Sequence, residues 1–264
     1  MSYKDKYALL TFDVEEFDTP LDYNCPIPFE DQIEISTRGL LLIKEVLEKC
    51  KVTSTLFVTA NYALQQKKLI KELSLNHEIA SHGHWHGSFK PEDLLSSKKI
   101  LEEITNQKIT GFRMARMMSV NEADIHDAGY FYNSSLNPIF LPGKYNNFTK
   151  PKQPFYKNEV LNIPASVSTV LRIPLFWLSF KNFPLSAYKL LSASALRKNG
   201  FLNIYFHPWE FVDLSKYDIP NFVKKHSKDI MINRLEKYVL WLKNKAEFIT
   251  MNQFFEIRKK KLRK

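Results

Sequence analysis

Cysteine and glycine are scarce in this sequence of 264 residues. Its two cysteines, Cys25 and Cys50, are too few for a disulfide framework or a four-thiolate zinc site, and we expect both as reduced thiols. Only 7 glycines and 13 prolines interrupt the chain, which argues against disorder and against a collagen-like repeat. With 44% hydrophobic and 25% charged residues, the composition is that of a globular protein of one large domain or two small ones.

Long uninterrupted apolar runs are also missing. Near the N-terminus, the apolar run Tyr7–Phe12 ends at Asp13, well short of the core of a secretory signal. The most apolar segment is Val170–Leu191, whereas a membrane span needs about 18 or more apolar residues with few charges. The residues that interrupt this segment are Arg172, Pro174, Lys181, Pro184 and Lys189. We therefore expect a cytoplasmic protein whose 170–191 segment can lie against a membrane surface without crossing it.

Positive charge is in excess, but it is concentrated at one end. The chain has 38 Lys and Arg against 28 Asp and Glu, a net charge of +10. Six of the eight residues in Ile257–Lys264 are basic, and without them the net charge is +4. We expect one domain over residues 1–256 and a basic tail over 257–264. The tail has no interleaved aromatic residues, so we expect no nucleic-acid partner. It could contact an anionic membrane surface, where each Lys or Arg contributes about 1 kcal/mol.

Apolar patterns predict alternating strands and helices. The strands are expected at residues 7–14, 52–58, 78–82, 109–113, 201–206 and 247–250, and the helices at 37–50, 64–75, 91–107, 122–128 and 230–245. Residues 133–164 lack periodicity and are expected as loops with short strands. The alternation favours an α/β barrel-like fold, in which functional groups lie at the carboxyl ends of the strands.

Three polar clusters follow predicted strands. They are Asp13-Val14-Glu15-Glu16, His82-Gly83-His84-Trp85-His86 and His207-Pro208-Trp209-Glu210. Singly, each has a plain explanation, since carboxylates can cap a helix and a histidine turn can be a solvated surface feature. Together they supply two imidazoles and a carboxylate, a ligand set that suits Zn, Fe, Co or Ni. Because His82 and His86 are four residues apart, we expect them on one side of a helical turn. His84 would then point elsewhere, as a supporting or surface residue.

Five ordered blocks resemble those of the polysaccharide deacetylases, the NodB-homology group or carbohydrate esterase family 4. The blocks begin at Thr11, Ser81, Gly111, Gly129 and Tyr205, and they span about four-fifths of the chain. The resemblance implies a distorted (β/α) barrel with fewer than eight repeats. It also implies one divalent metal ion at the carboxyl ends of the strands, zinc first, with cobalt or nickel as alternatives.

The resemblance also assigns roles to the acidic and histidine residues. Asp13 matches the catalytic base, and His82 and His86 match the metal-binding histidines. Where many members have a second Asp, this chain has Val14, so Glu15 becomes the expected ligand, as in a branch with an Asp-x-Glu first block. Glu16 is the alternative, ranked second because adjacent residues of an extended chain point oppositely.

Further roles follow for the later blocks. Arg113 resembles the arginine that orients the base, and His207 resembles the general acid. Trp209 is expected as a wall of the substrate pocket. Trp85 and Tyr132 are expected as further substrate-binding residues.

The implied reaction is the removal of an N-acetyl group from an amino sugar of a polysaccharide or lipid-linked glycan precursor. A bound metal lowers the pKa of water, Asp13 takes the proton, and His207 protonates the leaving amine. The identity of the sugar, the choice between acetyl and formyl, and the oligomeric state stay open.

Two departures from the family pattern stand out, and the first supports an alternative, a catalytically impaired member that binds carbohydrate through aromatic residues such as Trp85, Trp177 and Trp209. Asn133 stands where an Asp commonly supports the general acid, and an amide cannot stabilise an imidazolium by charge. The third block reads Arg113-Met114-Ala115-Arg116 instead of Arg-x-Pro, so a loop of different shape is expected there.

Overall fold

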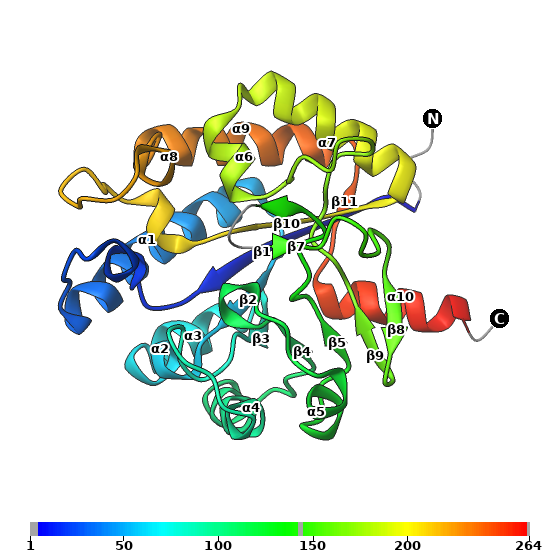
Figure 1. The fold of residues 1–264 in the computed structure, drawn as a ribbon, viewed down its shortest axis with the longest axis horizontal. Helices are drawn as coiled ribbons and strands as arrows, with labels where there is room; N and C mark the ends of the chain where they lie inside the picture. The colour runs from blue at the N-terminus through cyan, green and yellow to red at the C-terminus, as the bar shows by residue number, and fades with distance from the viewer. Residues whose placement is uncertain (1–4, 142–144, 263–264) are drawn as a thin grey trace.

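The computed structural model describes residues 5–141 and 145–262, and its centre is one curled sheet (Figure 1). Neighbouring strands in this sheet run in the order β10-β1-β2-β3-β4-β5-β9-β8, with β11 also paired to β1. All of these pairings are parallel except that of β8 with β9. The strands are β1 (Tyr7–Val14), β2 (Thr55–Val58), β3 (Glu78–Ser81), β4 (Gly111–Phe112), β5 (Tyr132–Asn133), β8 (Phe155–Lys157), β9 (Val160–Asn162), β10 (Phe201–Phe206) and β11 (Glu247–Phe248).

Helices cover the outside of the sheet. They are α1 (Phe29–Cys50), α2 (Ala60–Gln65), α3 (Lys67–Leu73), α4 (Glu92–Thr105), α5 (Glu122–Asp127), α6 (Trp177–Asn182), α7 (Leu185–Asn199), α8 (Asn221–Lys224), α9 (Asp229–Lys243) and α10 (Met251–Leu262). A separate two-stranded sheet pairs β6 (Phe140–Leu141) with β7 (Tyr145–Asn146). The architecture confirms the predicted α/β fold, a distorted barrel with fewer than eight repeats.

The register of the parallel strands brings the polar clusters to one rim. Phe12 of β1 pairs with Phe206 of β10, so that Asp13 and His207 follow side by side. On the other side of the barrel, Ser81 pairs with Phe112, and the next residues are His82 and Arg113. Four candidate functional residues, Asp13, His82, Arg113 and His207, therefore leave the ends of strands at the same edge.

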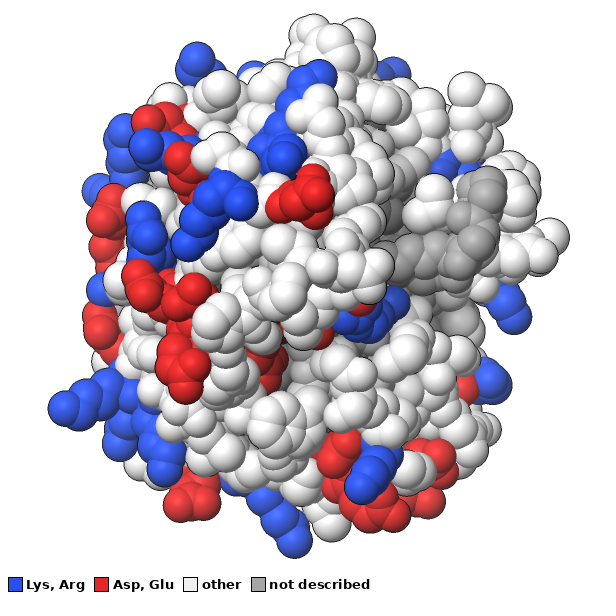
Figure 2. Space-filling model, turned by 60° about the vertical axis from the view of Figure 1, so that its left-hand side comes forward, with Lys and Arg blue, Asp and Glu red and all other residues white. Residues whose placement is uncertain are grey.

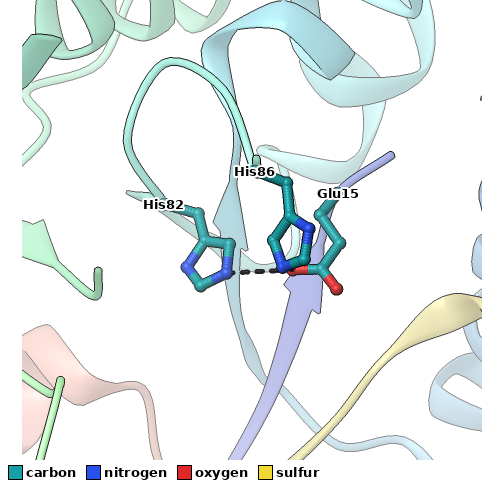
Figure 3. A group of neighbouring side chains, drawn as sticks. All are labelled: Glu15, His82 and His86. Atoms are coloured by element: carbon teal, nitrogen blue, oxygen red, sulfur yellow. Dashed lines mark hydrogen bonds and ion pairs between the residues drawn. The ribbon is translucent and has the colours of Figure 1, made fainter. Parts of the chain in front are cut away.

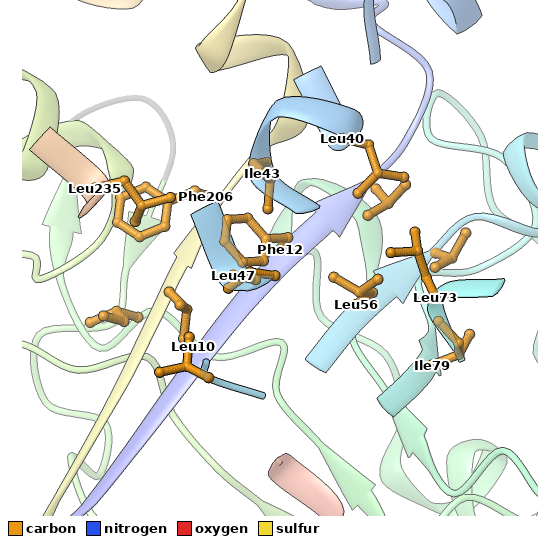
Figure 4. Close-up of a cluster of buried hydrophobic side chains, with 14 of the residues drawn as sticks. Leu10, Phe12, Leu40, Ile43, Leu47, Leu56, Leu73, Ile79, Phe206 and Leu235 are labelled. Atoms are coloured by element: carbon orange, nitrogen blue, oxygen red, sulfur yellow. The ribbon is translucent and has the colours of Figure 1, made fainter. Parts of the chain in front are cut away.

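Strand β1 separates two apolar clusters by its alternation. Leu10 and Phe12 face outward into the large cluster between sheet and helices, which Figure 4 shows in part. Leu9 faces the barrel interior, where a second cluster includes Phe57 and Phe201. Because side chains alternate across a strand, Asp13 shares the interior side with Leu9. The alternation of apolar side chains along β1 thus directs the carboxylate of Asp13 into the barrel.

Several element boundaries differ from the sequence-based expectations. Helix α1 begins at Phe29, directly after Pro28, eight residues before the predicted start at Thr37. The helix predicted over 64–75 is two short helices, α2 and α3, which meet at Gln66. Strand β10 has the predicted bounds, because its six residues are all buried and the chain turns at both ends.

The basic C-terminal segment, expected as a tail over 257–264, is helical as far as Leu262. Helix α10 runs from Met251 to Leu262, and residues 263–264 lie outside the described part of the chain. Phe254 and Phe255 are buried in the interior cluster at the end of the barrel opposite the polar rim. The guanidinium of Arg258 lies 4.9 Å from the ring centroid of Phe254. At least part of the basic segment is therefore committed to packing.

The surface contains no large region of one charge sign on the face that Figure 2 shows, where acidic and basic side chains are interspersed. The segment 170–191 forms α6 and most of the first half of α7, and Val170 is 79% exposed. Among the described residues, no helix is both long and apolar enough to span a membrane.

Candidate metal centre and catalytic pocket

Glu15, His82 and His86 form a compact, buried cluster at the rim (Figure 3). Glu15 follows the last residue of β1, and both histidines lie in the loop after β3. One carboxylate oxygen of Glu15, Oε2, lies 3.0 Å from Nε2 of His82 and 3.2 Å from Nε2 of His86. One ligand atom from each residue lies within 4.8 Å of the other two, so the three can face a common point.

The two histidines meet through a loop, which differs from the expected helical turn. The chain after Ser81 is irregular, and Gly83 adopts a φ of +83°, a conformation that favours glycine. The loop turns back so that the two imidazole rings stack at a centroid distance of 6.3 Å. His82 and His86 do lie together, as predicted, but the loop and not a helical turn brings them together.

Each imidazole is oriented by a partner on its other nitrogen. Nδ1 of His82 lies 2.9 Å from the backbone oxygen of Arg113, and Nδ1 of His86 lies 2.7 Å from Oδ1 of Asp18. Asp18 is in turn held by Arg116 at 3.1 Å. Since Nδ1 is the hydrogen-bond donor in both rings, Nε2 is the atom of each ring that faces Glu15, an arrangement typical of metal-ligating histidines. The sequence analysis did not identify Asp18.

Glu15 and Glu16 point in opposite directions. Glu15 faces the histidines, whereas the carboxylate of Glu16 accepts hydrogen bonds from Thr59 at 2.9 Å and from the amide of Asn61. The two glutamates are both buried, so burial does not distinguish them. The strand alternation does, and it favours Glu15 as the ligand.

Asp13 is paired with a fully buried arginine. Nη1 of Arg113 lies 2.5 Å from Oδ1 of Asp13 and 2.9 Å from the hydroxyl oxygen of Thr11. The other side of the guanidinium is held by Ser134, and its carbon lies 4.0 Å from the ring centroid of Phe57. The guanidinium thus fixes one carboxylate oxygen of Asp13 and leaves Oδ2 on the side of His207.

His207 lies opposite the cluster, and Glu210 supports it. Nε2 of His207 is 4.0 Å from Oδ2 of Asp13 and 4.0 Å from Oε1 of Glu15. Nδ1 lies 3.0 Å from Oε1 of Glu210, and the ring stacks on Trp209 at a centroid distance of 4.9 Å. The indole N–H of Trp209 donates to Glu15 at 3.3 Å.

Glu210 therefore occupies the place that the sequence analysis gave to Asn133, which is a correction. Asn133 donates to Asn162 at 3.1 Å, and its oxygen accepts the backbone N–H of Ser135 at 3.0 Å. Strand β5 carries Asn133 toward β9, away from His207. The signal that could have identified Glu210 is its position three residues after His207, within reach of one turn of helix. That turn exists as the short 3₁₀ helix Pro208–Phe211.

The charged groups shift one another's proton affinities. Burial acts to raise the pKa of Glu15, but His86, His207 and His82 outweigh it and hold this pKa well below its usual value. Burial lowers the pKa of His86, yet Glu15 and Asp18 raise it to about 8 overall. The pKa of His207 is also raised, since Glu15, Glu210 and Asp13 together outweigh its burial.

A cavity of about 230 Å³ contains these groups. Its functional lining includes Asp13, Glu15, His82, His86, His207 and Trp209. The arrangement brings together all of the expected catalytic and metal-binding side chains, with Arg113 directly behind Asp13. Trp177 is a further wall and meets His207 edge to face at 5.7 Å.

Two expected substrate-binding residues lie elsewhere. Tyr132 is fully buried, and its hydroxyl donates to Glu78 at 2.6 Å near the opposite end of the barrel. Trp85 is 45% exposed and stacks on His84, outside the cavity lining. Their positions in the sequence blocks gave no information on the direction of the side chains. His84 accepts or donates a hydrogen bond with Ser96 at 3.0 Å, apart from the cluster, as expected.

The loop after Arg113 has the unusual shape that its sequence suggested. Arg116 adopts a φ of 56°, in the left-handed region, within a short 3₁₀ helix, Ala115–Met117. Its guanidinium bridges Asp18 at 3.1 Å and Asp22 at 2.7 Å. Arg116 and Met117 thereby form one side of the cavity.

The donor set fits a divalent transition metal. One carboxylate and two imidazoles with oriented Nε2 atoms match the three protein ligands of catalytic zinc sites, which leave further positions for water and substrate. Iron, cobalt and nickel accept the same donors. Glu15, His82 and His86 are therefore suited to hold the metal.

Comparisons with known proteins concern the family and the fold. Residues 2–123 match the family model described as polysaccharide deacetylase, and this stretch contains every candidate ligand together with Asp13 and Arg113. No curated protein sequence matches the chain.

Solved structures share the fold at low sequence identity. A putative polysaccharide deacetylase from Mycobacterium smegmatis has a TM-score of 0.69 at 18% identity, over 98% of this chain and 92% of that one. Puue allantoinase has a TM-score of 0.67 at 14% identity, over 96% of this chain and 90% of that one. BA3943 of Bacillus anthracis, a pseudoenzyme of carbohydrate esterase family 4, has a TM-score of 0.53 at 12% identity, over 96% and 66% of the two chains. The similarity to the polysaccharide deacetylase family thus covers residues 2–123 by sequence, and the shared fold extends over nearly the whole chain.

Proposed function

We propose that the protein is a metal-dependent hydrolase that removes an N-acetyl group from an amino sugar of a polysaccharide or lipid-linked glycan precursor. The observation that carries the proposal is the single cavity in which Asp13 and His207 face the Glu15, His82 and His86 cluster. A base, an acid and a metal-binding group within one pocket are the components that amide hydrolysis requires.

The protein's own groups divide the proton transfers. A divalent metal held by Glu15, His82 and His86 supplies Lewis acidity when bound, which lowers the pKa of water and polarises an acyl oxygen. Asp13 has Oδ1 fixed on Arg113, and Oδ2 is available to take the proton of the attacking water. His207 presents Nε2 to the same space and can protonate the departing amine, which is a poor leaving group until it is protonated.

The size of the surrounding space supports a substrate larger than one sugar. The cavity of about 230 Å³ adjoins a second one of about 770 Å³, and both are lined by Arg116 and Met117. The second cavity is rich in amide and basic side chains, which can hydrogen-bond to sugar hydroxyls: Asn133, Asn146, Asn147, Asn162, Lys150 and Lys157. A neighbouring unit of a glycan chain would fit this space.

Acetate release tests the proposal. Purified protein is incubated with zinc, cobalt or nickel and with N-acetylated sugars, both soluble oligosaccharides and lipid-linked ones. We expect acetate in at least one metal-loaded sample and none after chelation. The contrary result is a protein that binds metal and sugar but releases no acetate from any of them.

That contrary result would favour a carbohydrate-binding member without catalysis. The sequence feature that raised this alternative was Asn133 in place of an acidic partner for His207. Because Glu210 provides that acidic partner, the reason for expecting impairment is weakened. The hydrolase is therefore the function that the site supports best.

A further inference from the structure

We propose that the buried pair Lys181 and Glu210 positions His207 and fixes which of its ring nitrogens carries the proton. The expected effect on kcat rests on the proposed hydrolase function. The effect on the tautomer of His207 can be tested without any enzymatic reaction. In this arrangement Glu210 is the acceptor that holds the ring, and Lys181 supplies the charge that accompanies the buried carboxylate.

Glu210 holds His207 at two points with one oxygen. Its Oε1 accepts the backbone N–H of His207 at 2.8 Å and lies 3.0 Å from Nδ1 of the ring. Glu210 has no exposed surface. It belongs to the 3₁₀ helix Pro208–Phe211, and this turn brings its carboxylate back to His207. Since an ionised carboxylate only accepts hydrogen bonds, Nδ1 must be the donor, and Nε2 is then the atom that faces the pocket.

Lys181 approaches the same carboxylate from a distant part of the chain. It belongs to α6, is fully buried, and places Nζ 3.6 Å from Oε2 of Glu210. Nζ also donates to the backbone oxygen of Val223 in α8 at 2.7 Å. Among the described residues, Oε2 of Glu210 has no hydrogen-bond partner, so the Lys181 ammonium is its electrostatic counterpart.

A fully buried ion pair is a weak source of stability. Transfer of both charges from water is costly, and apolar side chains of similar volume often stabilise a fold equally well or better. The pair lies next to His207, which lines the pocket. Within the described part of the chain, neither Lys181 nor Glu210 forms an ion pair or a hydrogen bond with Glu15, His82 or His86. These facts point to a role in the orientation of His207.

Orientation matters because the two nitrogens of an imidazole have different tasks here. With Nδ1–H directed at Glu210, Nε2 is the site that binds and releases the proton beside Asp13. Without an acceptor at Nδ1, the ring could rotate or adopt the other tautomer, with the hydrogen on Nε2. Lys181 places its ammonium 3.6 Å from Oε2 of Glu210 and so holds the carboxylate where Oε1 faces Nδ1 of His207.

A double variant separates orientation from stability. In Lys181→Met/Glu210→Leu, both charges are replaced by apolar side chains of similar size, but the backbone N–H of His207 loses its acceptor, so we expect a melting temperature below that of the wild type and above those of the single variants. We expect kcat to fall by about 10- to 100-fold, the loss that follows removal of a group supporting a functional histidine, with KM little changed. The single variants each leave an unpaired buried charge and should melt at lower temperature.

Conservative and remote variants provide the controls. Glu210→Gln retains an oxygen that can accept from Nδ1 and should recover part of kcat relative to Glu210→Leu. Lys98→Met makes the same lysine change at another buried site, where Nζ contacts the backbone oxygen of Ile109 and lies 3.3 Å from Glu102. This variant should lose stability and keep kcat. If Lys181→Met/Glu210→Leu also kept wild-type kcat, the positioning role would be wrong.

The tautomer of His207 can be read directly by ¹⁵N NMR of histidine-labelled protein at pH 9, with the His207→Gln variant for assignment. We expect the Nδ1–H form in the wild type and a shift toward the Nε2–H form in the double variant. An Nε2–H form in the wild type, or an unchanged tautomer in the double variant, overturns the proposal. If the tautomer changes as expected while no N-acetylated sugar releases acetate, the positioning stands and the proposed function fails.

Discussion

Two glutamates at opposite ends of the barrel differ in the groups that surround them. Glu15 follows the end of β1, and its neighbours are three imidazoles and an indole. Glu78 begins β3, and its oxygens accept hydrogen bonds from Tyr132 at 2.6 Å, Thr55 at 2.7 Å and the backbone N–H of Asn252 at 3.0 Å. The first set of neighbours can bind a metal or exchange protons, whereas the second consists of neutral donors.

The proton affinities reflect the two environments. Burial raises the pKa of Glu78, and its hydrogen bonds offset this only in part. At Glu15 the imidazoles reverse the effect of burial, and the pKa is lowered. Burial alone thus does not identify a catalytic or metal-binding carboxylate, because the chemistry of the surrounding donors decides its charge state.

The sharpest test of this comparison is the same substitution at both ends. Glu15→Gln removes one of the three ligands, so we expect zinc affinity to fall by more than about 100-fold and acetate release to disappear. Glu78→Gln should bind zinc as the wild type does. Isothermal titration calorimetry with zinc measures both, and equal losses in the two variants would contradict the assignment of the metal centre.

The next largest effect concerns Asp13, which shares the rim with Glu15 but is not in the ligand cluster. Asp13→Asn keeps the shape of the side chain and removes its capacity as a base. We expect kcat to fall by about 10²- to 10⁴-fold, the usual contribution of a proton-transfer group, with zinc affinity retained. Steady-state acetate release and zinc titration of the same sample check this, and lost zinc binding would make Asp13 a ligand instead.

A smaller effect is expected at Asp18, which orients His86 from behind. Asp18→Asn should lower zinc affinity by about 10- to 100-fold because the ring loses its charged partner. Asp22→Asn is the matched control, since Asp22 pairs with the same Arg116 at 2.7 Å but is not hydrogen-bonded to either histidine of the cluster. A similar loss in both variants would show that Arg116, and not the orientation of His86, controls the site.

The smallest effect is the pH dependence contributed by Glu78. Its pKa in the folded protein is raised above the ordinary value of 4.5, so its contribution to folding is fully present below pH 4.5 and is lost as pH rises through the raised value. Relative to Glu78→Gln, which does not titrate, the wild type should lose free energy of unfolding as pH increases. We expect a change below about 2 kcal/mol, measured by urea unfolding from pH 4.5 to 8. If the free energy of unfolding of the wild type rose with pH relative to that of Glu78→Gln, the folded protein would favour the ionised form of Glu78, contrary to the prediction.

The sequence predicted those parts of the site that depend on local periodicity. The alternation of side chains in an extended chain separated Glu15 from Glu16, and the apolar run Phe201–Phe206 ended where His207 begins. These features follow from one strand at a time. The fold itself followed from the strand and helix alternation together with the resemblance of the five blocks.

The parts that the sequence did not predict depend on contacts between distant segments. Asp18 meets His86 across 68 positions, and no pattern in either segment indicates the other. Tyr132 was expected in the pocket, but the register of β5 turns it toward Glu78. Helix α10 was missed because its apolar face is short and its basic residues suggested a solvated tail. Only Glu210, three residues from His207, was within reach of local reasoning.

The position of β1 between β10 and β2 in the sheet has a consequence for how the chain folds. This strand is made first, yet one of its neighbours is β10, whose Phe201 pairs with Tyr7. Until that late segment has left the ribosome, one edge of an almost wholly apolar strand has no partner, and such edges promote association between chains. Pairing over so long a loop is also slow, because contacts that are distant in sequence close late. The pocket is therefore assembled only after β10 has been synthesised, and termination before residue 201 would yield a chain that is prone to aggregate.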